Sequence, residues 1–138
     1  MNTEVMRPGV AGAPRILLRL EGLAVLAVAL LAFVAFDGAA ALGLRWWALI
    51  PVFLAPDLSM LAYLAGPRIG AIVYNAAHSY VAPLVIGALA FHALGRAPVA
   101  LCLLWIAHIG FDRALGYGLK YASGFGDTHL GSIGRRRT

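Results

Sequence analysis

Four long runs of apolar residues, separated by short polar segments, dominate the sequence. They cover residues 16–36, 46–65, 69–94 and 99–117. A helix that crosses the hydrocarbon core of a bilayer needs about 20 mostly apolar residues. Each run meets this length, so the pattern predicts four transmembrane helices with residues 1–15 and 118–138 as tails.

The segments between the runs have the composition of helix ends. Asp37-Gly38 follows the first run, and glycine, proline and arginine fill residues 66–68 and 95–98. Such residues stop helices. Because these connections are short, sequential helices should be antiparallel neighbours. We therefore expect an all-α, four-transmembrane-helix bundle that forms a single membrane domain over residues 1–138.

Composition supports a membrane protein and excludes other classes. Hydrophobic residues make up 62% of the chain and charged residues 12%, against about 45–50% and about 25% in soluble domains. This excludes a soluble enzyme and a disordered tail. The only cysteine, Cys102, allows neither an internal disulfide nor a cysteine-based metal cluster. The net charge of +5 comes from basic residues at the ends of the runs, so we expect a lipid bilayer and no nucleic acid as partner.

The basic residues also predict orientation. They concentrate before the first run, in the connection at Arg68 and after the fourth run, whereas the opposite side has only Arg45 and Arg96. Positively charged loops stay in the cytoplasm, so both termini should be cytoplasmic. The ten arginines against one lysine are typical of a GC-rich bacterial genome. We therefore expect a multi-pass protein of the bacterial cytoplasmic (inner) membrane.

A cleaved signal peptide is the alternative interpretation of the first run. Arg7, Arg15 and Arg19 form a basic leader, and alanines at residues 39–41 resemble a cleavage site. However, the apolar run is longer than the core of about 7–15 residues that signal peptides have, and it contains Glu21. We expect a retained helix.

Prolines predict irregular backbone inside two of the runs. Pro51 and Pro56, which precedes Asp57, remove backbone hydrogen bonds from the second run and favour a broken helix. Unwound backbone at membrane depth is tolerated where it is buried in protein or lines a cavity. The third run is the longest, which predicts a tilt, a kink at Pro83 or a start in the interface.

Ionisable residues inside the runs are the main functional signal. Such groups cost several kcal/mol at the bilayer centre and usually face a bundle interior. With a rise of about 1.5 Å per residue, six polar residues lie about 8 to 14 Å from the cytoplasmic ends of their helices. These residues are Glu21, Asp57, Asn75, His78, His108 and Asp112. His92 lies near the outer end and does not belong to the set.

Spacing along the helices supports one shared site. His108 and Asp112 are four residues apart and lie on one helical face. Asn75 and His78 are three residues apart. Since all four helices contribute at one depth, we expect a single intramembrane His/Asp/Glu site that faces the cytoplasm.

A metal site is the leading interpretation of this set. Imidazoles and carboxylates bind Zn²⁺, Mn or Fe, and a metal-bound water would suit hydrolysis of a lipid or another membrane-associated substrate. The expected metal ligands are His78, His108, Asp112 and Asp57. The expected catalytic residues are Glu21 and Asp127, and the expected supporting residues are Asn75, His129 and Arg113.

Three other interpretations stay open. His78 and His108 could bind a b-type haem from both faces, although covalent haem is excluded because no C-x-x-C-H motif is present. The set could instead conduct protons or ions, which in so small a chain would need a homo-oligomer. It could also be helix-packing glue, since polar contacts of this kind average about 0.6 kcal/mol in membrane proteins.

Several motifs resemble one family of small bacterial integral membrane proteins. They are Leu20-Glu21-Gly22, Ala55-Pro56-Asp57-Leu58-Ser59-Met60, Tyr74-Asn75-Ala76-Ala77-His78, residues 107–121 around His108, Gly124-Phe125 and residues 127–131. The family is named domain of unknown function 4260, and the resemblance covers residues 17–131. It implies a small integral membrane protein, and it assigns no activity.

Overall fold

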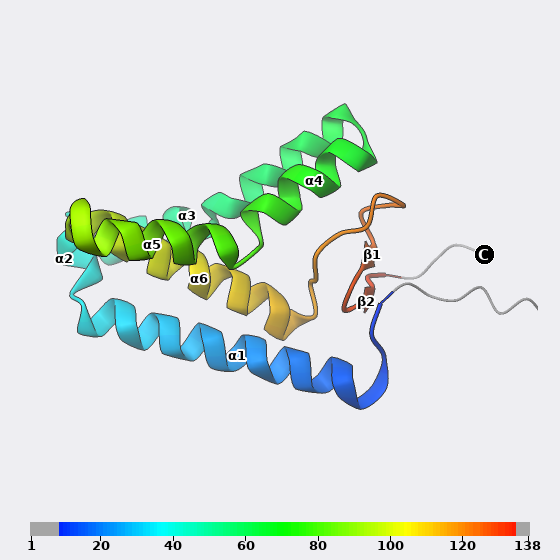
Figure 1. Cartoon of the computed structure of the whole chain (residues 1–138), viewed down its shortest axis with the longest axis horizontal. Helices are drawn as coiled ribbons and strands as arrows, with labels where there is room; N and C mark the ends of the chain where they lie inside the picture. The colour runs from blue at the N-terminus through cyan, green and yellow to red at the C-terminus, as the bar shows by residue number, and fades with distance from the viewer. Residues whose placement is uncertain (1–8, 135–138) are drawn as a thin grey trace, which may run out of the picture.

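The computed structural model describes residues 9–134, of which most are helical (Figure 1). Helix accounts for 74% of the structure. The elements in chain order are α1 (Gly12–Ala35), α2 (Gly38–Leu42), α3 (Trp46–Leu54), the 3₁₀-helix η1 (Ala55–Ala65), α4 (Pro67–Ala77), α5 (Val81–Ala93), α6 (Arg96–Leu115), β1 (Asp127–Thr128) and β2 (Gly131–Ser132).

Four helical segments are long and apolar enough to cross a membrane. They are Gly12–Ala35, Trp46–Ala65, Pro67–Ala93 and Arg96–Leu115. The four-span architecture predicted from the apolar runs is therefore confirmed, with bounds that differ by a few residues. Two spans, α1 and α6, are continuous helices, whereas the second consists of α3 and η1 and the third of α4 and α5.

The second span changes from α-helix to 3₁₀-helix beside Pro56. The α-helical part ends at Leu54, and η1 then continues for 11 residues. Runs of 3₁₀-helix longer than three or four residues are uncommon and often mark a functional position. The predicted break between Pro51 and Pro56 is confirmed at Pro56, while Pro51 lies inside α3.

The third span is interrupted at residues 78–80, in the turn directly before Pro83, where the proline ring conflicts with the helical carbonyl four residues back. Pro83 is the third residue of α5. A proline in the first turn of a helix is tolerated because the N–H that it lacks would have no helical partner there. The hydroxyl of Ser79 accepts a bond from Val81 N at 3.3 Å, which satisfies one free amide at the new helix start.

Helix α6 lies at the centre of the bundle and packs closely against α1. It contacts α1, α2, α3 and α5, and in Figure 1 it runs alongside α1. A Cβ atom on Gly110 would lie 2.7 Å from Leu26 N, and one on Gly22 would meet Arg113 and Ala114. The two glycines let the backbones of α1 and α6 approach directly, as small residues do in membrane helix pairs.

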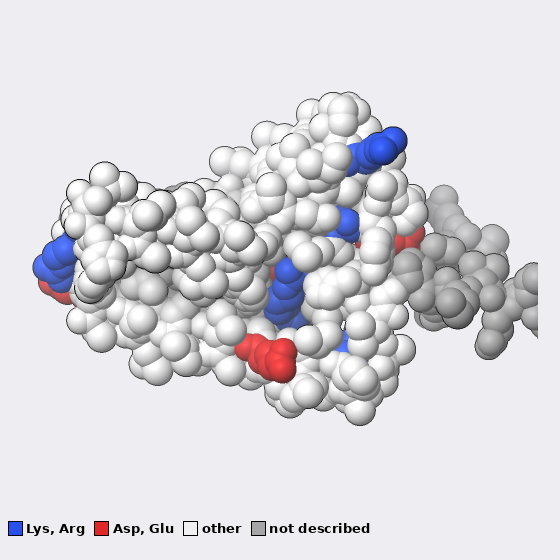
Figure 2. All heavy atoms as spheres, viewed as in Figure 1, with Lys and Arg blue, Asp and Glu red and all other residues white. Residues whose placement is uncertain are grey.

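The outer surface of the helices is apolar. Large hydrophobic side chains are exposed along the spans, with Leu64 89%, Val34 74% and Leu31 70% exposed. In Figure 2, an uncharged stretch separates the charged groups at the far left end of the molecule from those near its middle. Such a surface is costly in water and favourable in lipid, as expected of a multi-pass membrane protein.

The segment after α6, expected as a tail, folds back against the helices as a structured loop. Strands β1 and β2 form a two-stranded antiparallel hairpin, and Lys120 bridges Thr128. Val10 N donates to His129 O at 2.7 Å, which joins this segment to the chain just before α1. Figure 1 shows the hairpin beside the start of α1, at the same end of the bundle.

Candidate metal centre

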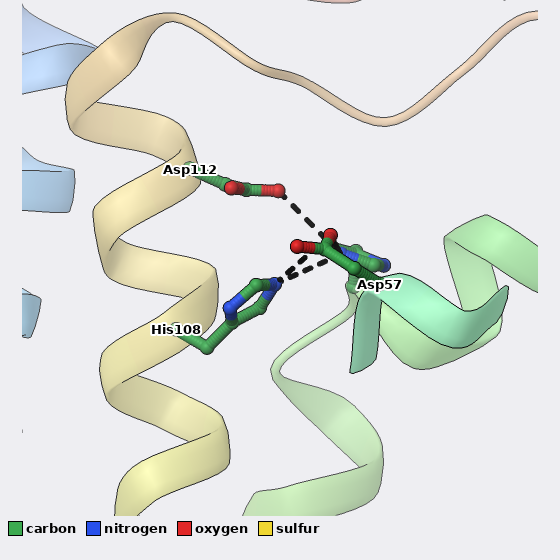
Figure 3. Close-up of side chains that lie close together, drawn as sticks. Asp57, His108 and Asp112 are labelled. Carbon is green, nitrogen blue, oxygen red and sulfur yellow. Dashed lines mark hydrogen bonds and ion pairs between the residues drawn. The ribbon is translucent and has the colours of Figure 1, made fainter. Parts of the chain in front are cut away.

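Four of the six polar positions expected at one depth converge inside the bundle. One ligand atom from each lies within 4.8 Å of the others. The members of this group, called the tetrad below, are Asp57, His78, His108 and Asp112. Figure 3 shows His108 and Asp112 pointing from one helix toward Asp57 on a neighbouring segment.

Four of the six separations within the tetrad match those of neighbouring ligands around a tetrahedral ion, and all six are at most 4.8 Å. His78 Nε2 lies 3.2 Å from His108 Nε2 and 3.4 Å from Asp57 Oδ1. Asp57 Oδ1 is also 3.4 Å from His108 Nε2, and Asp112 Oδ2 is 3.5 Å from His78 Nε2. Zinc bonds of about 2.0 to 2.2 Å in tetrahedral geometry separate neighbouring ligand atoms by about 3.3 to 3.6 Å.

His78 is held so that one ring nitrogen faces the centre of the tetrad. Its Nδ1 lies 3.0 Å from Tyr74 O. Because a carbonyl only accepts, we assign the proton to Nδ1, which leaves the lone pair of Nε2 directed at the tetrad when the ring is neutral. The Tyr74 ring also stacks on the imidazole with centroids 3.8 Å apart and planes 9° apart. Metal-binding histidines are commonly oriented by such a bond to a backbone carbonyl.

The interruption in the third span positions His78 and is stabilised by α6. The break leaves the carbonyls of Ala77 and His78 without helical partners. Trp105 Nε1 donates to Ala77 O at 2.6 Å, and Arg113 Nη2 donates to His78 O at 3.1 Å. Arg113 thus contacts the backbone of a tetrad member.

His108 and Asp112 lie one turn apart on α6, as their spacing predicted. Tyr74 Oη donates to Asp112 Oδ2 at 3.0 Å, which fixes that carboxylate. His108 packs edge-on against the Phe53 ring at 5.3 Å, and its Nδ1 has no hydrogen-bond partner within residues 9–134. The atom that faces the tetrad is Nε2, so an ion bound there would leave this Nδ1 unpaired.

Asp57 is the accessible member of the tetrad. It lies in the first turn of η1, and its side chain is 33% exposed, against 1% for His78 and His108. Together with Asp112 it lines a cavity of about 310 Å³ between η1, α4, the end of α6 and the C-terminal segment. The tetrad therefore opens on one side through Asp57.

The same cavity contains the buried side chain of Lys120. The ammonium group lies 4.1 Å from the centre of the Phe125 ring and 5.1 Å from that of Tyr74. Burial lowers the pKa of Lys120, and the charge of Asp112 opposes this shift. Asn75 holds the backbone here: Lys120 N donates to Asn75 Oδ1 at 2.7 Å, and Asn75 Nδ2 donates to Lys120 O at 2.9 Å.

The other residues expected at the site lie outside the tetrad. Glu21 is exposed and lines a different cavity of about 290 Å³ with Arg113 and His129. Asp127 accepts a bond from Ser123 Oγ at 2.8 Å within the C-terminal segment. These two expected catalytic residues are therefore not brought to the tetrad.

Two of the expected supporting residues organise the backbone after α6. Asn75 bonds to the backbone of Lys120. His129 accepts a bond from Leu119 N at 2.8 Å through Nδ1, and burial lowers the pKa of its imidazole. Both residues shape the segment that closes the Lys120 cavity.

Two residues at the site, Tyr74 and Lys120, were not predicted from the sequence. Tyr74 lies four residues before His78 and therefore shares its helical face, a signal that was present in the sequence. Lys120 gave no such signal because its segment has no helical or strand period.

The geometry does not fit a b-type haem held between His78 and His108. A haem with two histidine ligands has its iron and porphyrin plane between the two nitrogens. Here the two Nε2 atoms are 3.2 Å apart, and Asp57 Oδ1 lies 3.4 Å from both. This separation leaves no room for a porphyrin, so the haem hypothesis receives no support from the site.

Comparison with known proteins identifies one family. The family described as domain of unknown function (DUF4260) matches residues 15–133, which covers most of the chain. No curated protein and no solved structure matches the sequence.

Proposed function

The chain belongs to the DUF4260 family, and because that description assigns no activity, we propose its function from the site itself. We propose that Asp57, His78, His108 and Asp112 bind one divalent transition-metal ion within the membrane. The bound ion then acts on a lipid or another membrane-associated substrate. Zn²⁺ is the favoured ion, and Mn²⁺ and Fe²⁺ are the alternatives.

The observation that carries this proposal is the tetrahedral spacing of the tetrad together with the orientation of His78. Four ligand atoms from three elements converge, and four of their separations are between 3.2 and 3.5 Å. With the Nδ1 proton of His78 bonded to Tyr74 O, the Nε2 lone pair of His78 and two carboxylates face the centre. A cation stabilises such an arrangement, whereas helix-packing contacts pair donors with acceptors.

Exposure of Asp57 suggests how the site reacts. A catalytic zinc site keeps one position for water, whose pKa falls to about 7 on the metal. An ion held by Asp57, His78, His108 and Asp112 would supply Lewis-acid activation of water. We propose that Asp57, the exposed member of the tetrad, takes a proton from the attacking water while the water oxygen bonds to the ester centre, and returns it to the leaving oxygen when the ester bond breaks. Catalytic roles for Glu21 and Asp127 stay predictions, which the variants E21Q and D127N test.

We further propose that both termini and the nearby tetrad lie on the cytoplasmic side of a bacterial inner membrane. This rests on the arginines around residues 7–19, at Arg68 and after α6. A C-terminal fluorescent-protein fusion should fluoresce, and a C-terminal periplasmic phosphatase fusion should be inactive. The opposite pattern would reverse the orientation.

Metal analysis of the purified protein tests the proposed function. Detergent-solubilised protein, resupplied with Zn²⁺ and freed of excess, should retain one ion per chain by elemental analysis. Replacing zinc with Co²⁺ should give the intense visible bands of tetrahedral cobalt, because the spacing of the tetrad is tetrahedral.

The variant H92A is the matched control. His92 is an exposed histidine in the last turn of α5, outside the tetrad. It should bind metal like the wild type. Wild-type protein that retains no stoichiometric Zn²⁺, Mn²⁺ or Fe²⁺ would contradict the proposed function.

A further inference from the structure

The cavity beside the tetrad combines one buried cation with apolar and aromatic walls. Its lining residues include the carboxylates of Asp57 and Asp112 and the ammonium of Lys120. The remaining lining residues are Met60, Tyr74, Phe111, Tyr117, Phe125 and Ile133. A pocket of about 310 Å³ with a few converging polar groups is typical of a small-molecule site.

Lys120 has no carboxylate partner in the part of the chain that the structure describes. All the ion pairs there join His78 or His108 to Asp57 or Asp112. The Lys120 side chain, in a residue only 5% exposed, contacts the faces of two aromatic rings. A buried ammonium that contacts ring faces and has no carboxylate within ion-pair distance can still bind an anion.

The rim of the cavity is apolar and open to the surroundings. Phe111, Tyr117 and Phe125 are 38%, 41% and 47% exposed. Leu58 and Leu61 of η1, close in sequence to Asp57 and Met60, are also exposed, at 67% and 63%. A ligand with an anionic head and an apolar tail would satisfy both Lys120 and this rim.

We infer that the cavity binds the phosphate headgroup of a phosphorylated lipid, with Lys120 and the metal ion on either side of the phosphate. The inference rests on the proposed function, because without the ion the cavity has two carboxylates against one lysine and would repel an anion. With a divalent ion in the tetrad, the charge changes sign and phosphate oxygens can approach both cations. Lys120 is then a substrate-positioning residue.

Binding of a non-hydrolysable lipid tests this inference. The probe is a phosphonate analogue of dioctanoyl phosphatidic acid, in which a methylene group replaces the ester oxygen. It is titrated calorimetrically into zinc-loaded protein in detergent micelles, and metal content is measured on the same samples. The wild type should bind the probe, and removal of zinc with a chelator should abolish binding.

The variant K120M should weaken binding by about tenfold or more, because it removes a charge-assisted contact to the phosphate. Its backbone bonds to Asn75 involve only main-chain atoms of Lys120, so the segment should stay in place. K120R should bind within a few-fold of the wild type. R68M removes an exposed charge at the start of α4 and should bind unchanged. K120Q serves as the second neutral variant if K120M unfolds.

The outcomes separate the inference from the proposed function. The wild type, K120M and K120Q could each hold one zinc per chain and bind the probe equally well. That result would overturn the inference and leave the proposed metal site intact. Equal binding of dioctanoylglycerol would overturn recognition of phosphate, and equal binding of inorganic phosphate would overturn recognition of a lipid. Absence of zinc from the wild type would contradict the proposed function, and the inference with it.

Discussion

The two continuous spans and the two interrupted spans of the bundle contribute differently to it. Helices α1 and α6 run unbroken for 24 and 20 residues and pack through Gly22 and Gly110. The other two spans change direction or helix type at Pro56 and at residues 78–80, beside Asp57 and His78. Irregular backbone is tolerated at membrane depth where it lines a cavity or is buried in protein, and here both irregularities supply a member of the tetrad.

The continuous helix also holds the interruption in place. The carbonyls freed by the break at His78 accept bonds from Trp105 and Arg113, both on α6. His108 and Asp112 come from the same helix. Helix α6 is therefore the rigid half of the site, and the interrupted spans bring the remaining ligands to it.

Loss of a tetrad histidine should have the largest effect. The variants H78A and H108A each remove a ligand nitrogen, so zinc retention should fall from one ion per chain to near zero. Both proteins should still insert, because the helices remain long and apolar. Elemental analysis after detergent purification measures the metal, and circular dichroism checks the helices. If the tetrad is only packing glue, wild type and variants will all lack metal and the variants will melt at modestly lower temperature.

A smaller effect is expected when the support of a ligand is removed. The variant Y74F deletes the hydroxyl that donates to Asp112 Oδ2, so zinc affinity should fall by about 10- to 100-fold. Competition with a chromophoric chelator measures this affinity. Y63F is the matched control, because the Tyr63 hydroxyl is buried without a partner among the described residues. If Y74F and Y63F lost equal zinc affinity, the loss in Y74F would not result from its missing bond to Asp112.

A change at the contact between the continuous helices α1 and α6 should lower the stability of the protein and leave its zinc affinity unchanged. In G110A the new Cβ would lie 2.7 Å from Leu26 N, so α1 and α6 must separate, at a cost of about 1 to 3 kcal/mol. In G87A the new Cβ would lie 3.2 Å from Cys102 Cβ, so its neighbour must move by only a few tenths of an ångström. Thermal unfolding in micelles should therefore show a larger decrease for G110A. If G110A lost much of its zinc affinity at temperatures where it is still folded, the proposed distinction between the two pairs of spans would be contradicted.

The architecture could be predicted because each span is a long apolar run with glycine, proline or charge at its ends. The break at Pro56 was also predictable, since a proline inside an apolar run removes a backbone bond. The break at residues 78–80 was predictable only as one alternative, a kink at Pro83. Its position also depends on contacts that the sequence does not show: Val81 N donates to Ser79 Oγ, and α6 side chains bind the freed carbonyls. The hairpin at residues 127–132 was missed because two-residue strands show no alternation.

The tetrad could be predicted from depth, but depth alone assigned too many residues to it. Glu21 lies at the expected level, yet the neighbouring Gly22 is the residue that faces α6. Successive residues of a helix point about 100° apart, so Glu21 faces a different cavity. His108 and Asp112 could be placed with more certainty because a spacing of four fixes the face as well as the level.

X-ray absorption at the zinc edge of the loaded wild-type protein tests the central claim most directly. The account predicts four nitrogen or oxygen neighbours at about 2.0 to 2.2 Å, with the multiple-scattering signature of two imidazoles. The signature should fall to one imidazole or disappear in H108A and persist unchanged in H92A. A first shell that contains sulfur from Cys102, a shell of water oxygens without imidazole, or no retained zinc would contradict the account.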